Sequence, residues 1–174
     1  MNGWPHLVKR FFGALNPAGP SAADEVWVES VLGAGSGTHR LWAEMSGPDR
    51  RHAVGVAQRA ELAAGASSTP DLIAAALLHD VGKITSGFGT LARVPITLIG
   101  AGGGRSRAER WTAAGGVRGR IGRYLRHPEE GSELLRSAGA PALAVAWALE
   151  HHRPPPRWTV PQAAAIILKE ADDD

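Results

Sequence analysis

The feature that most constrains the fold is an apolar run from Leu72 to Leu78, followed at once by His79 and Asp80. A segment this apolar is typical of a buried helix, and Asp71 before it favours a helix start. Gly82 favours the end of that helix. A charged carboxylate at the end of an apolar helix is costly unless it is paired or binds a metal ion. The run therefore predicts a buried helix that ends in a polar site at His79 and Asp80.

Helical signals recur along the rest of the chain, and no segment has the length and alternation of a β-strand. Ser21 with Asp24 resembles a helix N-terminal cap, and Asp49 is placed to cap a later helix. The expected helices cover residues 24–32, 39–45, 49–64, 71–82, 117–126, 128 onward, 141–152 and 161–174. The sequence thus predicts an all-α fold, a single compact multi-helix bundle.

The chain length of 174 residues suits one domain. We expect residues 1–20 to form an N-terminal leader and residues 21–174 to form the domain. Glycines at 102–104 and 115–116 mark residues 84–116 as an insertion with one or two short helices, a possible lid.

Cysteine is absent, which excludes disulfides, zinc–thiolate sites and cysteine nucleophiles. There is also no apolar run of the ~18 residues that a transmembrane helix needs, and no signal-peptide pattern. Phosphate-loop, nucleophile-elbow and dinucleotide-binding motifs are missing as well. We therefore expect a cytoplasmic protein without a transmembrane segment.

An arginine-rich stretch runs from Arg105 to Arg126 and contains a single acid, Glu109. One interpretation is a solvated helical face. The other is an electropositive rim that attracts a phosphorylated substrate or, as a further alternative, nucleic acid. Because no aromatic ladder accompanies the arginines, we do not expect nucleic acid as the partner.

Two pairs of neighbouring residues stand out among the polar groups: His79-Asp80, and His151-His152 directly after Glu150. Adjacent residues on a helix point about 100° apart, so one helical face cannot present both histidines. At a helix end, however, both side chains can converge on a pocket over the terminus.

These residues resemble the HD-domain superfamily, whose members are mostly metal-dependent phosphohydrolases and phosphodiesterases. The resemblance spans roughly residues 49–172 and is strongest over Ala74–Lys83, which matches the signature segment. The further matching segments are Arg51–Val56, His127–Leu135, Glu150–His152 and Ala171-Asp172. The segments His127–Leu135 and Glu150–His152 resemble those of the binuclear branch, which includes the cyclic di-GMP hydrolases, and Ala171-Asp172 resembles the final aspartate position of the family. The Gly-Tyr-Pro element of those hydrolases is replaced here by Arg153–Trp158, so the resemblance does not extend to that activity.

Carried over position by position, the resemblance implies two divalent metal ions. The first would be held by His52, His79, Asp80 and Asp172. The second would be held by His127, His151, His152 and, as a bridging ligand, Asp80. Imidazoles with a carboxylate suit Mn, Fe, Co, Ni or Zn better than Mg or Ca. Asp173 or Glu170 is the alternative to Asp172, which stands close to the end of the sequence; a site completed by a homodimer is a further alternative.

The resemblance also implies that Lys83 approaches the substrate phosphate, against the simpler interpretation of a lysine that faces a helix dipole. Arg51, Arg59 and Arg153 are weaker candidates for a phosphate contact. The implied activity is hydrolysis of a phosphate ester, nucleotide-like, by a metal-bridging hydroxide, with Asp80 and Lys83 as the catalytic residues. The alternative is a regulatory module that keeps the fold and the metals and senses a nucleotide without hydrolysing it.

Overall fold

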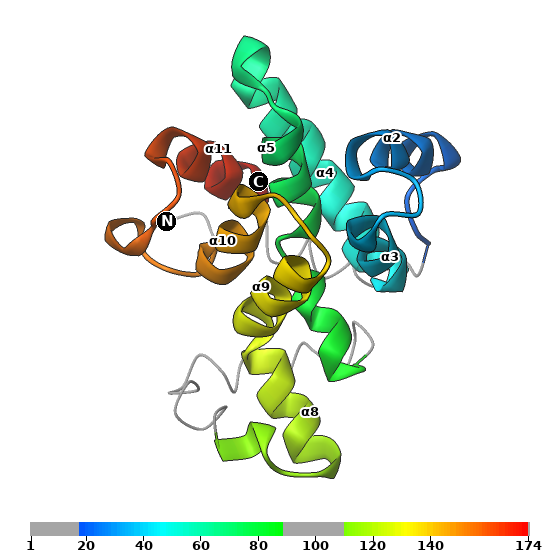
Figure 1. Cartoon of the computed structure of the whole chain (residues 1–174), viewed down its shortest axis with the longest axis vertical. Coiled ribbons are helices and arrows are strands. Elements are labelled where there is room, and N and C mark those ends of the chain that lie inside the picture. Colours follow the sequence, from blue (N-terminus) through cyan, green and yellow to red (C-terminus); the bar gives the residue numbers. More distant parts are fainter. Residues whose placement is uncertain (1–17, 89–109, 174) are drawn as a thin grey trace.

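The computed structural model describes residues 18–88 and 110–173 (Figure 1). The α-helices are α2 (Ala22–Leu32), α3 (Gly37–Glu44), α4 (Gly47–Ala64), α5 (Pro70–Leu78), α8 (Gly116–Leu125), α9 (His127–Ser137), α10 (Ala142–Glu150) and α11 (Gln162–Asp173). The short 3₁₀ helices are η1 (Gly65–Ser67), η2 (Val81–Ser86) and η3 (Pro155–Arg157). These described ranges contain no strand, which confirms the all-α prediction. Most of the predicted leader and most of the predicted insertion lie outside the described residues.

Helix α5 occupies the centre of the bundle and contacts α2, α3, α4, α10 and α11 (Figure 1). Thr69 caps it by accepting a 3.2 Å hydrogen bond from the backbone N–H of Leu72. Every residue from Leu72 to Leu78 is buried, as the apolar run predicted. The helix ends at Leu78 and not near Gly82, because the chain tightens into the 3₁₀ helix η2 just after His79 and Asp80. This tighter turn places both polar residues at the end of the central helix.

Helices α2, α3 and α4 each begin after a serine cap. Ser21 and Asp24 form the predicted capping box at α2. The expectation that Asp49 caps α4 was wrong, because Ser46 occupies the cap and accepts from the Asp49 N–H at 3.3 Å. The Ser46 hydroxyl in turn donates to Asp49 Oδ2 at 2.6 Å. Asp49 therefore lies in the first turn of α4, where its negative charge suits the positive end of the helix.

Helices α2 and α3 share the central core with the rest of the bundle. Val28 and Trp42 are fully buried in it. The Glu25 carboxylate accepts from Trp42 Nε1 at 3.0 Å and from Arg50 Nη1 at 2.8 Å, which joins α2 to α3 and α4. The half-buried ion pair thus fixes the N-terminal helices against the helix that carries His52.

Helix α9 approaches η2 closely at a pair of glycines. A Cβ atom added to Gly82 would lie 1.9 Å from the carbonyl oxygen of His127, and one added to Gly131 would lie 3.0 Å from the backbone nitrogen of Gly82. Only glycine at Gly82 permits this backbone contact. The contact holds the segment that carries Asp80 and Lys83 against the start of α9.

Candidate metal centre

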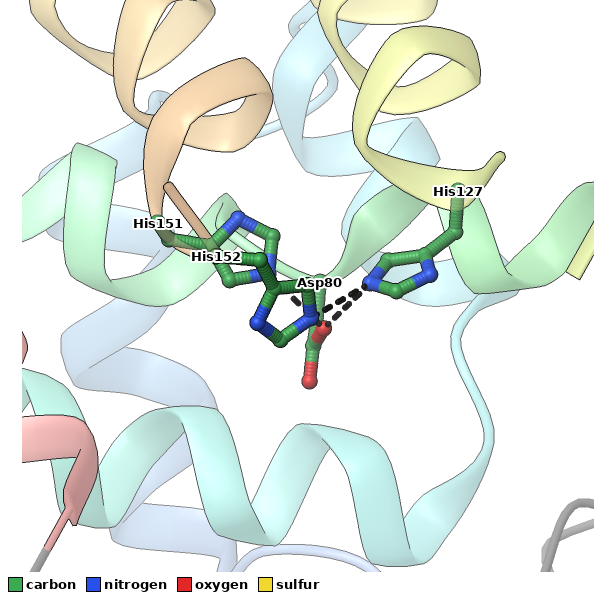
Figure 2. Close-up of side chains that lie close together, drawn as sticks. All are labelled: Asp80, His127, His151 and His152. Carbon is green, nitrogen blue, oxygen red and sulfur yellow. Dashed lines mark hydrogen bonds and ion pairs between the residues drawn. The ribbon is translucent and has the colours of Figure 1, made fainter. Parts of the chain in front are cut away.

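Asp80 lies at the middle of a cluster of histidines, and its two carboxylate oxygens face different partners. Oδ1 lies 3.5 Å from His127 Nε2 and 3.7 Å from His151 Nε2 (Figure 2). Oδ2 lies 3.4 Å from His79 Nε2 and also contacts the ammonium of Lys83. With 4% of its surface exposed, Asp80 is a buried carboxylate between two sets of possible ligands.

The first set, which we call the α9–α10 group, consists of Asp80, His127, His151 and His152. Figure 2 shows the three imidazoles converging on the Asp80 carboxylate, with His127 from the start of α9 and the pair from the end of α10. His127 Nε2 and His152 Nε2 are 3.2 Å apart. Two ligands at a metal–nitrogen distance of about 2.0–2.1 Å would be separated by about 2.9–3.4 Å. The expected convergence of His151 and His152 over a helix end is therefore present, at a spacing that suits one ion.

The second set, the α4–α11 group, consists of His52, His79, Asp80 and Asp172. Ligand atoms of the first three lie close enough together to hold a metal ion. Asp172 Oδ1 lies 3.1 Å from His52 Nε2 and 3.7 Å from His79 Nε2. The alternatives to Asp172 lie elsewhere, because Glu170 is exposed and Asp173 pairs with Lys169 on the surface.

Three of the histidines are oriented by the helix ends at which they stand. A carbonyl oxygen can only accept a hydrogen bond, so a ring nitrogen bonded to one must donate. The Nδ1 atoms of His79, His127 and His151 donate to the carbonyl oxygens of Ala76, Tyr124 and Ala148, at 2.8, 2.8 and 2.9 Å. These carbonyls belong to the last turns of helices, where intrahelical partners are missing. The bonds leave each Nε2 atom to face Asp80.

The buried Nε2 atoms of His79 and His151 make no hydrogen bond of normal geometry in the described part of the chain. An unsatisfied buried nitrogen is costly unless another ligand completes its environment. A divalent metal ion supplies that environment, and a histidine ligand normally donates its other ring N–H to a carbonyl or carboxylate. The donors of this cluster therefore fit a metal ion.

The protonation states follow from burial and charge. Burial opposes ionisation of Asp80, but Lys83 and His79 outweigh it and hold the pKa of this carboxyl well below its usual range. Burial likewise opposes the charge of Asp172, and the hydrogen bond from His52 keeps its pKa low. Burial disfavours the charged form of His79 too, yet the Asp80 carboxylate raises the pKa of His79 to about 9. Both carboxylates are thus ionised at neutral pH.

His52, His151 and His152 behave differently from His79. Burial lowers the pKa values of His52 and His151, and together with the neighbouring imidazoles it lowers the pKa of His152 to about 2. These three rings are therefore neutral at pH 7. Neutral imidazole is the form that binds a metal ion.

Lys83 reaches the centre from η2 and pairs with Asp80, with 20% of its side chain exposed. Burial disfavours its charged form, but the Asp80 carboxylate outweighs burial and raises the lysine pKa. Arg153 is placed differently, because its Nη1 atom lies 3.8 Å from Glu150 Oε1 and it belongs to neither ligand group. A phosphate contact by Lys83 or Arg153 stays a prediction.

Glu150 and Arg59 support the segments next to the ligand residues, and the sequence did not predict this role for either. Glu150 is 2% exposed, and its carboxylate accepts from the N–H and the hydroxyl of Thr159, each at 2.7 Å, so it fixes the chain that follows the histidine pair. Arg59, considered above for a phosphate contact, donates from Nε to the Ala171 carbonyl at 2.9 Å and so supports the residue next to Asp172. The signal for Glu150 was a carboxylate within an apolar helix; Arg59 gave no signal.

Two arginines of the arginine-rich stretch bind backbone carbonyls. Arg120 Nε donates to Ser86 at 3.0 Å while its guanidinium lies 4.2 Å from the centre of the Phe88 ring. Arg123 Nε donates to Thr85 at 3.0 Å. These side chains hold the end of η2 against α8, so this part of the stretch has a structural explanation. Residues 105–109 lie outside the described ranges.

None of the helices in the described ranges is long and apolar enough to cross a bilayer. No curated protein and no solved structure is significantly similar to the chain. A family match, to the HD domain, extends over residues 50–173 and so includes every member of both ligand groups. HD domains bind divalent metals, and the superfamily is one of metal-dependent phosphohydrolases. With its histidine and aspartate cluster inside that match, the chain belongs to the HD-domain family.

Proposed function

We propose that the protein is a binuclear metal-dependent phosphohydrolase that cleaves a small phosphate ester, nucleotide-like in character. The observation that carries the proposal is the sharing of Asp80: one carboxylate oxygen faces the α9–α10 group and the other faces His79 of the α4–α11 group. A carboxylate used in this way can bridge two ions.

The proposal assigns the ligand residues to two metal ions. His127, His151 and His152 would hold one ion, and His52, His79 and Asp172 the other, with Asp80 common to both. Imidazole and carboxylate donors favour Mn, Fe, Co, Ni or Zn. Two such ions, when bound, lower the pKa of a shared water molecule and neutralise charge on a phosphoryl group.

Lys83 is the residue we assign to the substrate. Its ammonium contacts Asp80 and its side chain is partly exposed, so we expect that a phosphate oxygen can approach it. A cation at this position stabilises the charge that develops as the phosphoryl group is transferred. Asp80 and Lys83 are therefore the catalytic residues of the proposal, and Arg153 stays a weaker candidate for substrate binding.

The proposal is tested by metal analysis of the purified protein, followed by an assay with Mn²⁺ on bis-p-nitrophenyl phosphate and on a panel of nucleotides. We expect bound metal and metal-dependent hydrolysis. His39→Ala is a matched control, because His39 accepts from the Gly35 N–H at 3.2 Å and lies outside both ligand groups. Its activity should equal that of the wild type.

Two results would contradict the proposal. Protein that binds metal but hydrolyses none of these substrates would favour the nucleotide-sensing module. Protein that binds no divalent metal would remove the basis for either interpretation of the cluster.

A further inference from the structure

Lys83 forms an ion pair with the carboxylate oxygen of Asp80 that a metal ion in the α4–α11 group would need. Its ammonium contacts Oδ2, which is also the oxygen 3.4 Å from His79 Nε2. We infer that Lys83 is the resident counter-ion of the metal-free centre, and that metal binding in the α4–α11 group displaces it from Asp80 and so frees it for substrate phosphate. This inference rests on the proposed function, and concerns the order in which its parts assemble.

The first step of the argument is charge. A lysine ammonium and a divalent ion repel each other, and in a buried site this repulsion is much stronger than in water. Asp80 is 4% exposed, so solvent does little to screen the two cations. Lys83 and the ion cannot both keep close contact with Oδ2.

The second step is the asymmetry of Asp80. His127 and His151 of the α9–α10 group face Oδ1, whereas Lys83 contacts Oδ2. An ion can therefore enter the α9–α10 group without displacing the lysine. The α4–α11 group should load second and more weakly, because part of its binding free energy is spent on breaking the Lys83–Asp80 pair.

The third step is what can move. The backbone of η2 is held by the Gly82–Gly131 contact and by the hydrogen bond from Arg123 to the Thr85 carbonyl. The Lys83 side chain, by contrast, is flexible and partly exposed. Asp49, in the first turn of α4, also stabilises the Lys83 charge electrostatically. The ammonium can therefore leave Asp80 by a side-chain rotation and keep a favourable environment.

The functional consequence is coupling between metal and phosphate. When an ion displaces the lysine from Asp80, the ammonium becomes available to phosphate, so the ion raises the affinity for phosphate. By linkage, bound phosphate raises the affinity for the ion by the same factor. The same side chain thus weakens metal binding alone and strengthens phosphate binding once the metal is present.

The test is calorimetric titration of the full chain with Mn²⁺. Lys83→Met should tighten the weaker binding event by about tenfold or more, because the competing charge is gone. Lys83→Gln, a second neutral replacement, should give the same direction. Lys169→Met is the matched control: it removes a lysine paired with Asp173 on the surface, and should change Mn²⁺ affinity by less than about twofold.

Double variants locate the effect. The tightening by Lys83→Met should disappear in a His52→Ala background and persist in a His152→Ala background, because only the former removes a ligand of the α4–α11 group. Orthophosphate affinity should rise with Mn²⁺ in the wild type and respond much less in Lys83→Met.

The outcomes separate this inference from the proposed function. If the wild type binds two Mn²⁺ ions and hydrolyses substrate while neither Lys83 variant binds Mn²⁺ more tightly, the counter-ion role is wrong and the proposed function stands. If the Lys83 variants gain affinity although the wild type hydrolyses nothing, the counter-ion role is supported and the enzymatic proposal fails.

Discussion

The two ligand groups around Asp80 differ in how the chain builds them. The α9–α10 group draws three imidazoles from two helix ends, and two of them are neighbours in the sequence. The α4–α11 group brings together two imidazoles and two carboxylates from α4, the end of α5 and α11. His52 and Asp172 are 120 positions apart, yet their side chains lie 3.1 Å apart.

This difference teaches that the α4–α11 group depends more on tertiary packing than the α9–α10 group does. Backbone carbonyls at helix ends orient His127 and His151, and also His79 of the α4–α11 group. Asp172, by contrast, reaches His52 only because α11 packs on α4, with Arg59 joining the two helices. The α4–α11 group should therefore respond to changes that loosen the bundle, while the α9–α10 group should tolerate them.

The largest effect is expected from Asp80→Ala, which removes the one residue that both ligand groups share. Asp80→Ala deletes both carboxylate oxygens, so neither group keeps its ligand set. We expect loss of both metal ions and a fall in kcat/KM of at least about 10³-fold, equivalent to about 4 kcal/mol of barrier. Metal content by mass spectrometry and the phosphodiester assay measure both. An Asp80→Ala protein that kept its full metal content would show that the two groups are independent.

A smaller effect is expected from Glu150→Gln, which targets the chain after the α9–α10 histidines. The new amide has one accepting oxygen in place of two, so the hydrogen bonds from Thr159 to a charged carboxylate are weakened, and the ion pair with Arg153 is lost. We expect a loss of about 1–3 kcal/mol in the free energy of unfolding, measured with denaturant. The accompanying loss of Mn²⁺ affinity should fall on the α9–α10 group. Equal weakening of both groups would mean that Glu150 acts on the whole bundle.

The smallest effect is expected from Arg59→Met, which keeps the aliphatic stem but removes the hydrogen bond to the Ala171 carbonyl. Residues that support metal ligands typically contribute about 10–100-fold in affinity, and the lower end is expected here because His52 still holds Asp172. The weaker Mn²⁺ binding event should lose about tenfold and the stronger one should stay unchanged. A change confined to the stronger event would reverse the assignment of the two groups.

The fold class and the two polar pairs, His79-Asp80 and His151-His152, were open to prediction from the sequence because their signals are local, whereas the roles of His52, His127 and Asp172 came from the family resemblance. An apolar run that ends in His79-Asp80, serine caps and a histidine pair after an apolar helix each act over a few residues. Ser46 shows the limit of this approach: the cap of α4 was assigned to Asp49, three positions late, because both residue types favour helix starts.

Contacts between distant segments were beyond prediction. The Gly82–Gly131 contact, the bond from Arg59 to Ala171 and the pairing of Arg120 and Arg123 with the end of η2 join elements whose mutual placement no periodicity encodes. From the sequence Arg153 is a weaker candidate for a phosphate contact, and its placement 3.8 Å from the Glu150 carboxylate needed the folded turn after α10.

The bonds from imidazole Nδ1 atoms to helix-end carbonyls have a consequence for the free energy of metal binding. They freeze the ring flips of His79, His127 and His151 before any ion arrives. Ordering a side chain during binding reduces the binding free energy by about 0.5–1.5 kcal/mol, and three ligands are already ordered in the folded protein before a metal ion binds. The same bonds satisfy carbonyl oxygens in the last turns of α5, α8 and α10, so they also stabilise these helix ends. In this protein the same three hydrogen bonds satisfy helix ends and fix the tautomers of three metal-ligand histidines.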